Sequence, residues 1–274
     1  MNDRDYYDFA WRQIGGKEHP YNAEKTKIIL DIIPRECSTI VDVGCGDGAI
    51  SNVLAERYAV IGIDISWEAL KHLSTRVLGI GGSADHLPFK DRCADLVLSS
   101  ELLEHLPEDA FSEAISEIKR ISRRYILITV PNKEKLRKRY TKCNVCGFEF
   151  HIYGHIRSFN LNRLTRYFDG YSIRCSTVCG APDEKSFDLI SYLVNRLANS
   201  YFSVDTVSIL CPNCGNVLSF PFKNNLAQRL IGFSLVKLQD ILNLLLNRKP
   251  EPDWLVVLFE KAEKLNKSGA RSLL

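Results

Sequence analysis

Residues 40–48 constrain the fold of this chain more than any other stretch. Their sequence, IVDVGCGDG, is an apolar run that carries one acid, Asp42, and ends in three alternating glycines. Such a run predicts a strand, and the glycines predict a tight turn where backbone can approach a ligand closely. Asp47 lies inside this turn. Because like charges repel, an acid there favours a cationic or neutral ligand over a pyrophosphate.

The rest of the first half alternates short β-branched runs with helical patterns. We expect helices over residues 22–33, 49–57, 67–77 and 108–122, and strands over residues 39–43, 59–64, 79–85, 95–100 and 125–130. This alternation predicts a doubly wound α/β fold, whose mostly parallel sheet is covered on both faces. Ligands in such sheets bind at the carboxyl ends of the strands. Asp64, Asp85 and Ser100 end three of the predicted strands, so that edge is the expected functional edge.

Composition limits the class of protein. The chain has 274 residues, of which 45% are hydrophobic and 25% charged, and a net charge of +3. These values are ordinary for a globular protein, and the charge is too small to indicate nucleic-acid binding by itself. We see neither a signal-peptide pattern at the start nor an apolar run long enough to span a membrane, so we expect a cytoplasmic protein without a membrane span.

Four of these segments together resemble the class I S-adenosylmethionine-dependent methyltransferases. They are VDVGCGDG at 41–48, IGID at 61–64, SAD at 83–85 and LVLSSELLEHL at 96–106. The order and the spacing, 22 residues from Asp42 to Asp64 and 21 from Asp64 to Asp85, carry the resemblance. A dinucleotide-binding domain would show G-x-G-x-x-G, whereas this chain has G-x-G-x-G. The resemblance implies a seven-stranded Rossmann-like sheet whose last strand is antiparallel, and residues 253–260 fit that strand.

The resemblance also implies a set of residues that bind the cofactor, S-adenosylmethionine. Asp42 and the turn would hold the methionine part, Asp64 the ribose hydroxyls, and Asp85 the adenine amine. The expected cofactor site comprises Asp42, Gly44, Cys45, Gly46, Gly48, Asp64, Ile65, Ala84, Asp85, His86, Ser100 and Glu101.

Two histidines are candidates for catalysis. His105 lies in the ELLEHL segment, and His155 begins an H-x-R-x-F segment that related methyltransferases place beside the substrate pocket. Either histidine could act as a base or orient the acceptor, and a purely structural role is an equal alternative. Because methyl transfer is an in-line displacement on an activated donor, proximity and alignment can supply much of the rate without a base.

Two cysteine pairs share one pattern. Cys143 with Cys146, and Cys211 with Cys214, are C-x-x-C-G knuckles of the kind that bind zinc, separated by residues 147–210. We expect the four thiolates to form one structural zinc site. A second partition would join the first pair to His151 and His155, and the second pair to Cys175 and Cys179.

The region after Pro131 is expected to recognise the acceptor. Residues 119–142 hold ten Lys or Arg against a single acid, Glu134. This run indicates either a solvated face or a phosphate-bearing substrate, whereas thin aromatic interleaving disfavours single-stranded RNA. Residues 226–246 predict a long helix that packs as a lid over the pocket or against the domain.

These observations divide the chain into a cofactor-binding core at 1–140, a zinc-binding and helical insertion within 141–252, a final core strand at 253–262 and a polar tail at 263–274. We expect a methyltransferase acting on a small molecule or a phosphate-bearing metabolite. The alternatives are an RNA or protein methyltransferase that grips a polymer with the zinc element, and a non-catalytic binding module that retains the fold.

Overall fold

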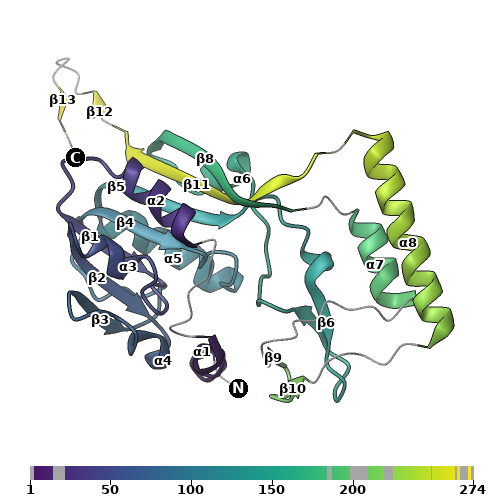
Figure 1. Ribbon diagram of the computed structural model, residues 1–274. Coiled ribbons are helices and arrows are strands. Elements are labelled where there is room, and N and C mark those ends of the chain that lie inside the picture. Colours follow the sequence, from purple (N-terminus) through teal and green to yellow (C-terminus); the bar gives the residue numbers. More distant parts are fainter. Residues whose placement is uncertain are drawn as a thin grey trace.

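A single twisted sheet organises the molecule (Figure 1). The structure, a computed structural model, describes residues 3–14, 22–183, 187–197, 209–218, 225–247, 249–262, 264–265 and 271–272. The sheet has seven strands in the order β3-β2-β1-β4-β5-β11-β8. Their bounds are β1 Thr39–Val43, β2 Ala59–Asp64, β3 Val77–Gly81, β4 Ala94–Ser100, β5 Ser122–Pro131, β8 Tyr171–Asp183 and β11 Glu251–Lys261.

The strand directions confirm the predicted fold class. Strands β1 to β5 pair in parallel, whereas β11 is antiparallel to both β5 and β8. The register places Trp254 of β11 opposite Pro131 of β5. Because β11 runs the other way, its first residues lie at the same edge as the carboxyl ends of β1, β2, β4, β5 and β8.

Helices cover both faces of the sheet and bury two apolar clusters. On one face, α5 (Glu108–Ile121) buries Phe111, Ala114 and Ile118, and α6 (Leu161–Thr165) buries Leu164. On the other face, α2 (Asn22–Ile32) and α3 (Ser51–Leu54) pack through Ile29 and Leu54. The strands between are buried on both sides, which is why their sequences read as continuous apolar runs.

Three predicted segments have different bounds in the structure. The helix expected over 49–57 is only α3, and that expected over 67–77 is only α4 (Trp67–Leu70). The amide of Ser74 instead bonds Asn52 Oδ1 at 2.8 Å, and the amide of Val77 bonds the Ser74 carbonyl at 3.0 Å. These bonds turn the chain early, so that β3 begins at Val77 and the predicted strand over 79–85 is displaced towards the N-terminus.

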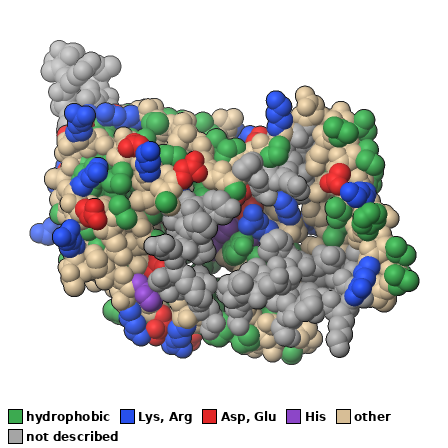
Figure 2. All heavy atoms as spheres, in the orientation of Figure 1, with side chains coloured by type: hydrophobic (Ala, Val, Ile, Leu, Met, Phe, Trp, Pro, Cys, Tyr) green, Lys and Arg blue, Asp and Glu red, His purple; other side chains and the backbone are tan. Residues whose placement is uncertain are grey.

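The insertion between β5 and β11 contains two hairpins and two longer helices. The hairpins pair β6 (Tyr140–Lys142) with β7 (Glu149–His151), and β9 (Ile209–Leu210) with β10 (Val217–Leu218). Helices α7 (Asp188–Leu197) and α8 (Leu226–Leu245) stand together on the far side of the hairpins from the sheet (Figure 1). Apolar side chains gather over α8 in Figure 2. In the described part of the chain, none of the helices has the length and apolar character needed to cross a membrane.

Candidate functional site

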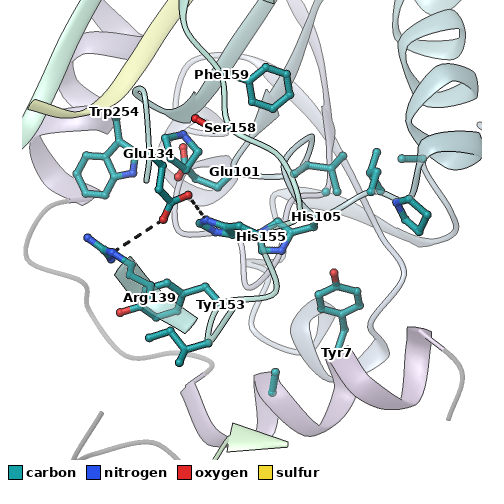
Figure 3. A pocket seen from close by; sticks show the side chains of 18 of the residues that line it. Tyr7, Glu101, His105, Glu134, Arg139, Tyr153, His155, Ser158, Phe159 and Trp254 are labelled. Atoms are coloured by element: carbon teal, nitrogen blue, oxygen red, sulfur yellow. Dashed lines mark hydrogen bonds and ion pairs between the residues drawn. The ribbon is translucent and has the colours of Figure 1, made fainter. Parts of the chain in front are cut away.

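A cavity of about 1440 Å³ opens at the expected edge of the sheet (Figure 2). All seven strands of the sheet contribute to its walls, near their ends or just beyond, through Gly44, Asp64, Gly82, Glu101, Pro131, Ala181 and Trp254. The segment after β7 and strand β9 form another side, with Ile152, Tyr153, His155 and Ile209, and Figure 3 shows Tyr153 and His155 there. The cavity therefore joins the sheet edge to the insertion.

The glycine turn has the close-packed backbone that the sequence predicts. Gly44 and Gly46 have φ values of +75° and +55°, a region that side chains rarely adopt. A Cβ atom would lie 2.9 Å from a Leu102 methyl at Gly44, and 2.7 Å from the Trp11 ring at Gly46. Only glycine fits these two positions, and the space in front of Gly44 belongs to the cavity.

Asp64 is tied to the turn by its carboxylate. Oδ2 accepts the Gly46 amide at 2.8 Å, and Oδ1 accepts the Ser66 amide at 2.8 Å. Burial raises the pKa of Asp64, and these amide bonds oppose that rise. Since each carboxylate oxygen can accept a second hydrogen bond, Asp64 can still take two hydroxyl donors from a ligand in the cavity.

Some of the predicted cofactor residues line the cavity, and the others do not. Gly44, Asp64, Ile65, Ala84, Asp85 and Glu101 line it, whereas Asp42, Cys45, Gly46, Gly48, His86 and Ser100 do not. Asp42 is buried in β1, where its Oδ2 accepts the Ser51 hydroxyl at 2.6 Å, and burial raises its pKa to about 7. The individual roles expected for these residues stay predictions.

Glu101 is held in an unusual backbone conformation at the end of β4. Its φ of +55° is costly for a residue with a side chain, and such strain is common at functional sites. Its Oε1 accepts the Thr129 hydroxyl at 2.9 Å and lies 3.7 Å from Lys25 Nζ. The Thr129 hydroxyl also bonds the Ser100 hydroxyl at 2.7 Å, so Ser100 supports Glu101 from behind.

The two candidate catalytic histidines meet at the other end of the cavity. The rings of His105 and His155 pack edge to face with centroids 4.7 Å apart (Figure 3). His155 Nδ1 lies 2.6 Å from Glu134 Oε2, and the His155 ring stacks on His151 at 4.5 Å. Burial lowers the pKa of His105 to about 3, because an imidazolium there would lose its hydration.

Glu134 is the residue of this cluster that sequence reasoning missed. It is the only acid in a strongly basic run, which was the available signal. Although burial alone would raise its pKa, hydrogen bonds to His151 and His155 hold the pKa of Glu134 below its ordinary value. Arg139 Nε lies 3.9 Å from Glu134 Oε1 (Figure 3).

The N-terminal helix α1 (Asp3–Ile14) was not predicted and covers part of the cavity. Asp8 accepts the Ser66 hydroxyl at 2.5 Å, and the ring of Tyr7 lies edge to face with His105, with centroids 6.2 Å apart. The expected helical lid is therefore α1 rather than the helix over 226–246. No residue described in α8 lines the cavity, since α8 packs against α7.

The four knuckle cysteines come together as predicted. Cys143 Sγ lies 3.6 Å from Cys214 Sγ, and Cys146 Sγ lies 3.7 Å from Cys211 Sγ. Zinc–sulfur bonds of about 2.3 Å in a tetrahedron separate the sulfurs by about 3.8 Å, so the four thiolates fit a zinc ion. This arrangement favours the four-cysteine partition over the one with His151, His155, Cys175 and Cys179.

The basic run is divided between the two edges of the sheet. Lys119, Arg120, Arg123 and Arg124 pair with acids at the edge opposite the cavity. Lys133 and Arg139 line the cavity, but each also lies beside a carboxylate, Glu251 and Glu134 respectively. The run is thus mostly a set of ion pairs rather than one anion-binding surface.

Comparisons with known proteins agree with this fold. Residues 41–125 match the profile of a methyltransferase domain family. Over 101 residues the chain is 38% identical to an uncharacterized protein of Methanocaldococcus jannaschii. The aligned segment covers 36% of this chain and 43% of that protein. Over 81 residues it is 38% identical to a ubiquinone biosynthesis O-methyltransferase of Nitrosomonas europaea. This alignment covers 26% of the present chain and 34% of the other protein. The chain thus spans less than half the length of these relatives.

A solved structure extends the likeness beyond the matched core. The S-adenosylmethionine-dependent methyltransferase of Archaeoglobus fulgidus superposes with a TM-score of 0.52 over 93% of this chain and 99% of that one, at 19% identity. At that identity the likeness concerns the fold alone.

Proposed function

We propose that the protein transfers a methyl group from S-adenosylmethionine to a small-molecule acceptor, because residues 41–125 match a methyltransferase domain family. The observation that carries this proposal is one cavity with two chemically different ends. Asp64 and the glycine turn line one end, and His105 and His155 line the other. The cavity volume exceeds the range of about 300–1000 Å³ that is usual for a single small ligand. The cavity is therefore large enough for a donor and an acceptor together.

The sheet edge would hold the cofactor. Asp64 accepts the two ribose hydroxyls, the backbone at Gly44 lies along the methionine part, and Asp85 accepts the adenine amine. Glu101 adds negative charge near the position of the cationic sulfur, which favours a sulfonium over a neutral ligand. The bound cofactor supplies an activated methyl group.

The histidine end would position the acceptor. Tyr7 lies beside His105 and Tyr153 lies beside His155, so the pocket suits a compact, partly apolar molecule with a polar reactive atom. Alignment of that atom with the methyl group can supply much of the rate. A phosphate-bearing acceptor has less support, since Lys25, Lys133 and Arg139 each lie beside a carboxylate.

The proposal is tested with Asp64→Ala and Asp64→Asn. Each hydrogen bond to a charged acceptor contributes about 1.5–3 kcal/mol, so loss of two predicts roughly a 100-fold or larger loss of cofactor affinity in Asp64→Ala. Isothermal titration with S-adenosylmethionine measures this, and Asp64→Asn, which keeps one acceptor oxygen, should lose less. Glu56→Gln is the matched control, because Glu56 is exposed and does not line the cavity.

A second readout concerns the acceptor. With cofactor carrying a tritiated methyl group, the wild-type protein should label the small-molecule fraction of a cell extract, and Asp64→Ala should not. Labelling of RNA or protein instead would support a polymer acceptor. Failure of the wild-type protein to bind the cofactor would indicate a binding module that retains only the fold.

A further inference from the structure

A cluster of potential metal ligands lies at the histidine end of the cavity. Glu104 and His105 come from the loop after β4, and His155 comes from the segment after β7. One side-chain donor atom from each lies within 4.8 Å of those of the other two. The Glu104 side chain is fully buried, whereas His105 is 17% exposed and lines the cavity with His155. The cluster is therefore enclosed at the back and open towards the cavity.

Glu104 has an unusual environment for a carboxyl group. Neither of its side-chain oxygens has a hydrogen-bond partner among the described residues, and neither does Nδ1 of His105. Leaving a polar group buried and unpaired destabilises the folded protein, and more so if the group is charged. Such a group in a folded protein requires an explanation, and a bound ion is one of the few available. A cation between Glu104 and the two histidines would give the Glu104 carboxylate the partner that it lacks.

The hydrogen-bond pattern assigns the tautomers of the neighbouring imidazoles. His151 Nδ1 accepts the backbone amides of Tyr153 and His155, both at 3.3 Å, so the proton of a neutral His151 is on Nε2. That atom lies 3.2 Å from Glu134 Oε1, while His155 Nδ1 lies 2.6 Å from Glu134 Oε2. Glu134 thus accepts from both rings, and His155 keeps the lone pair of Nε2 for another partner.

This assignment selects one of two overlapping ligand groups. Glu134, His151 and His155 also lie close enough together to hold an ion, but His155 Nδ1 and His151 Nε2 are both directed at the Glu134 carboxylate, at 2.6 and 3.2 Å. The two oxygens of Glu104, by contrast, have no hydrogen-bond partner among the described residues. A carboxylate that holds the far nitrogen of a ligating histidine is the usual support of a metal site, and Glu134 has that relation to His155.

We propose that Glu104, His105 and His155 bind a divalent cation such as Mn²⁺ or Fe²⁺, with Glu134 as the positioning residue for His155. Two imidazoles and one carboxylate suit first-row divalent metals and leave coordination positions open. The open positions face the cavity, where an oxygen or nitrogen atom of a ligand could occupy them. The site is separate from the four cysteines, and its existence does not depend on the proposed methyl transfer.

The proposal is tested by titrating the full chain with Mn²⁺ alone and following the loss of the free-ion signal by electron paramagnetic resonance. Mn²⁺ prefers oxygen and nitrogen ligands, so the four thiolates should not compete for it. We expect one bound ion per chain in the wild-type protein. Glu104→Gln and His155→Gln should each weaken binding at least tenfold, and Glu134→Gln should weaken it roughly tenfold or more through the orientation of His155.

Controls separate loss of the site from loss of the fold. His72→Gln and Glu113→Gln change exposed residues of the same types and should bind as the wild type does. Thermal unfolding adds a readout that a structural role would not move. Mn²⁺ should raise the melting temperature of the wild type but not of Glu104→Gln, which removes a buried charge and should itself fold. Absence of binding by the wild type at millimolar Mn²⁺, or undiminished binding by both Glu104→Gln and His155→Gln, would overturn the proposal.

Discussion

Individual carboxyl groups in this protein have very different environments within one sheet edge. Asp64 accepts two backbone amides, Glu101 accepts a hydroxyl and lies beside Lys25, and Asp42 has only the Ser51 hydroxyl. Oδ1 of Asp42 has no partner among the described residues. An ionised carboxylate with so little compensation is destabilising, which is why burial raises the pKa of Asp42 to about 7.

This environment predicts that Asp42 makes the protein less stable as pH rises. The unfolded chain releases the Asp42 proton near its ordinary pKa of about 4, whereas the folded chain retains it up to about pH 7. The free energy of unfolding should therefore fall between these values. Asp42→Asn lacks this titration, so its stability relative to wild type should increase by up to about 4 kcal/mol across the same range.

Urea unfolding of both proteins at a series of pH values measures this difference. Other groups titrate identically in the two proteins and cancel in the comparison. A difference that stays constant between about pH 4 and pH 7 would show that Asp42 is ionised in the folded protein throughout.

The sequence predicted cavity residues best where they lie at the end of a strand that is recognisable from its apolar run. Asp64 and Gly44 follow recognisable strands, and the structure places both at the cavity. Glu134 was missed because its partners, His151 and His155, lie 17 and 21 positions further along the chain. Nothing local to a single acid in a basic run says which distant imidazoles it will meet.

At the scale of elements, the two cysteine knuckles form a small unit with little other support. Each knuckle closes a hairpin, and the cysteine amides bond the carbonyls of Phe148 and Asn216 at 2.8 Å. Among the described residues, the shared apolar cluster contains only Phe150, Ile152, Ile209 and Leu218 besides the two buried cysteines. So small a core cannot hold two short hairpins together without a metal or another cross-link.

We therefore expect Cys146→Ser to lose zinc and to loosen both hairpins. Zinc measured by mass spectrometry should fall by one ion per chain, because three thiolates hold the ion far less well than four. Amide exchange should accelerate in β6, β7, β9 and β10, and remain slow in β1 and β4. Cys175→Ser is the matched control, since Cys175 lies on β8 away from the knuckles. Unchanged zinc content in Cys146→Ser would contradict the four-cysteine site.

The elements themselves were predicted with uneven success, for physical reasons. The core strands were identified because they are buried on both faces and therefore continuously apolar. Helix α4 is shorter than predicted because the Asn52 side chain accepts the Ser74 amide and the chain turns early. Helix α1 was missed because its first residues, Asp3 to Tyr7, are polar or aromatic and face the cavity rather than an apolar core.

At the scale of the whole molecule, the proposed donor and acceptor ends of the cavity are built from different segments of the chain. The donor end belongs to the sheet, which the sequence predicted well, whereas the acceptor end combines His105 from the loop after β4 with residues of the insertion and α1. Contacts between these parts join residues far apart in the sequence, such as Asp8 with Ser66 and Arg12 with Glu68, and no local pattern encodes them. Only the tertiary structure brings α1 over the glycine turn.

This arrangement predicts that a ligand at the sheet edge stabilises α1. Trp11 packs on Gly46, Tyr7 reaches the cavity, and Asp8 is bonded to Ser66 beside Asp64, so opening of α1 and release of the ligand should be coupled.

Hydrogen exchange with and without S-adenosylhomocysteine measures this coupling. We expect slower exchange in residues 44–48 and in α1 when the ligand is bound. Helix α8, which contributes no described residue to the cavity, serves as the internal control and should exchange at the same rate in both states. Protection confined to residues 44–48 would mean that α1 opens independently of the ligand, and that the cavity is covered only by the insertion.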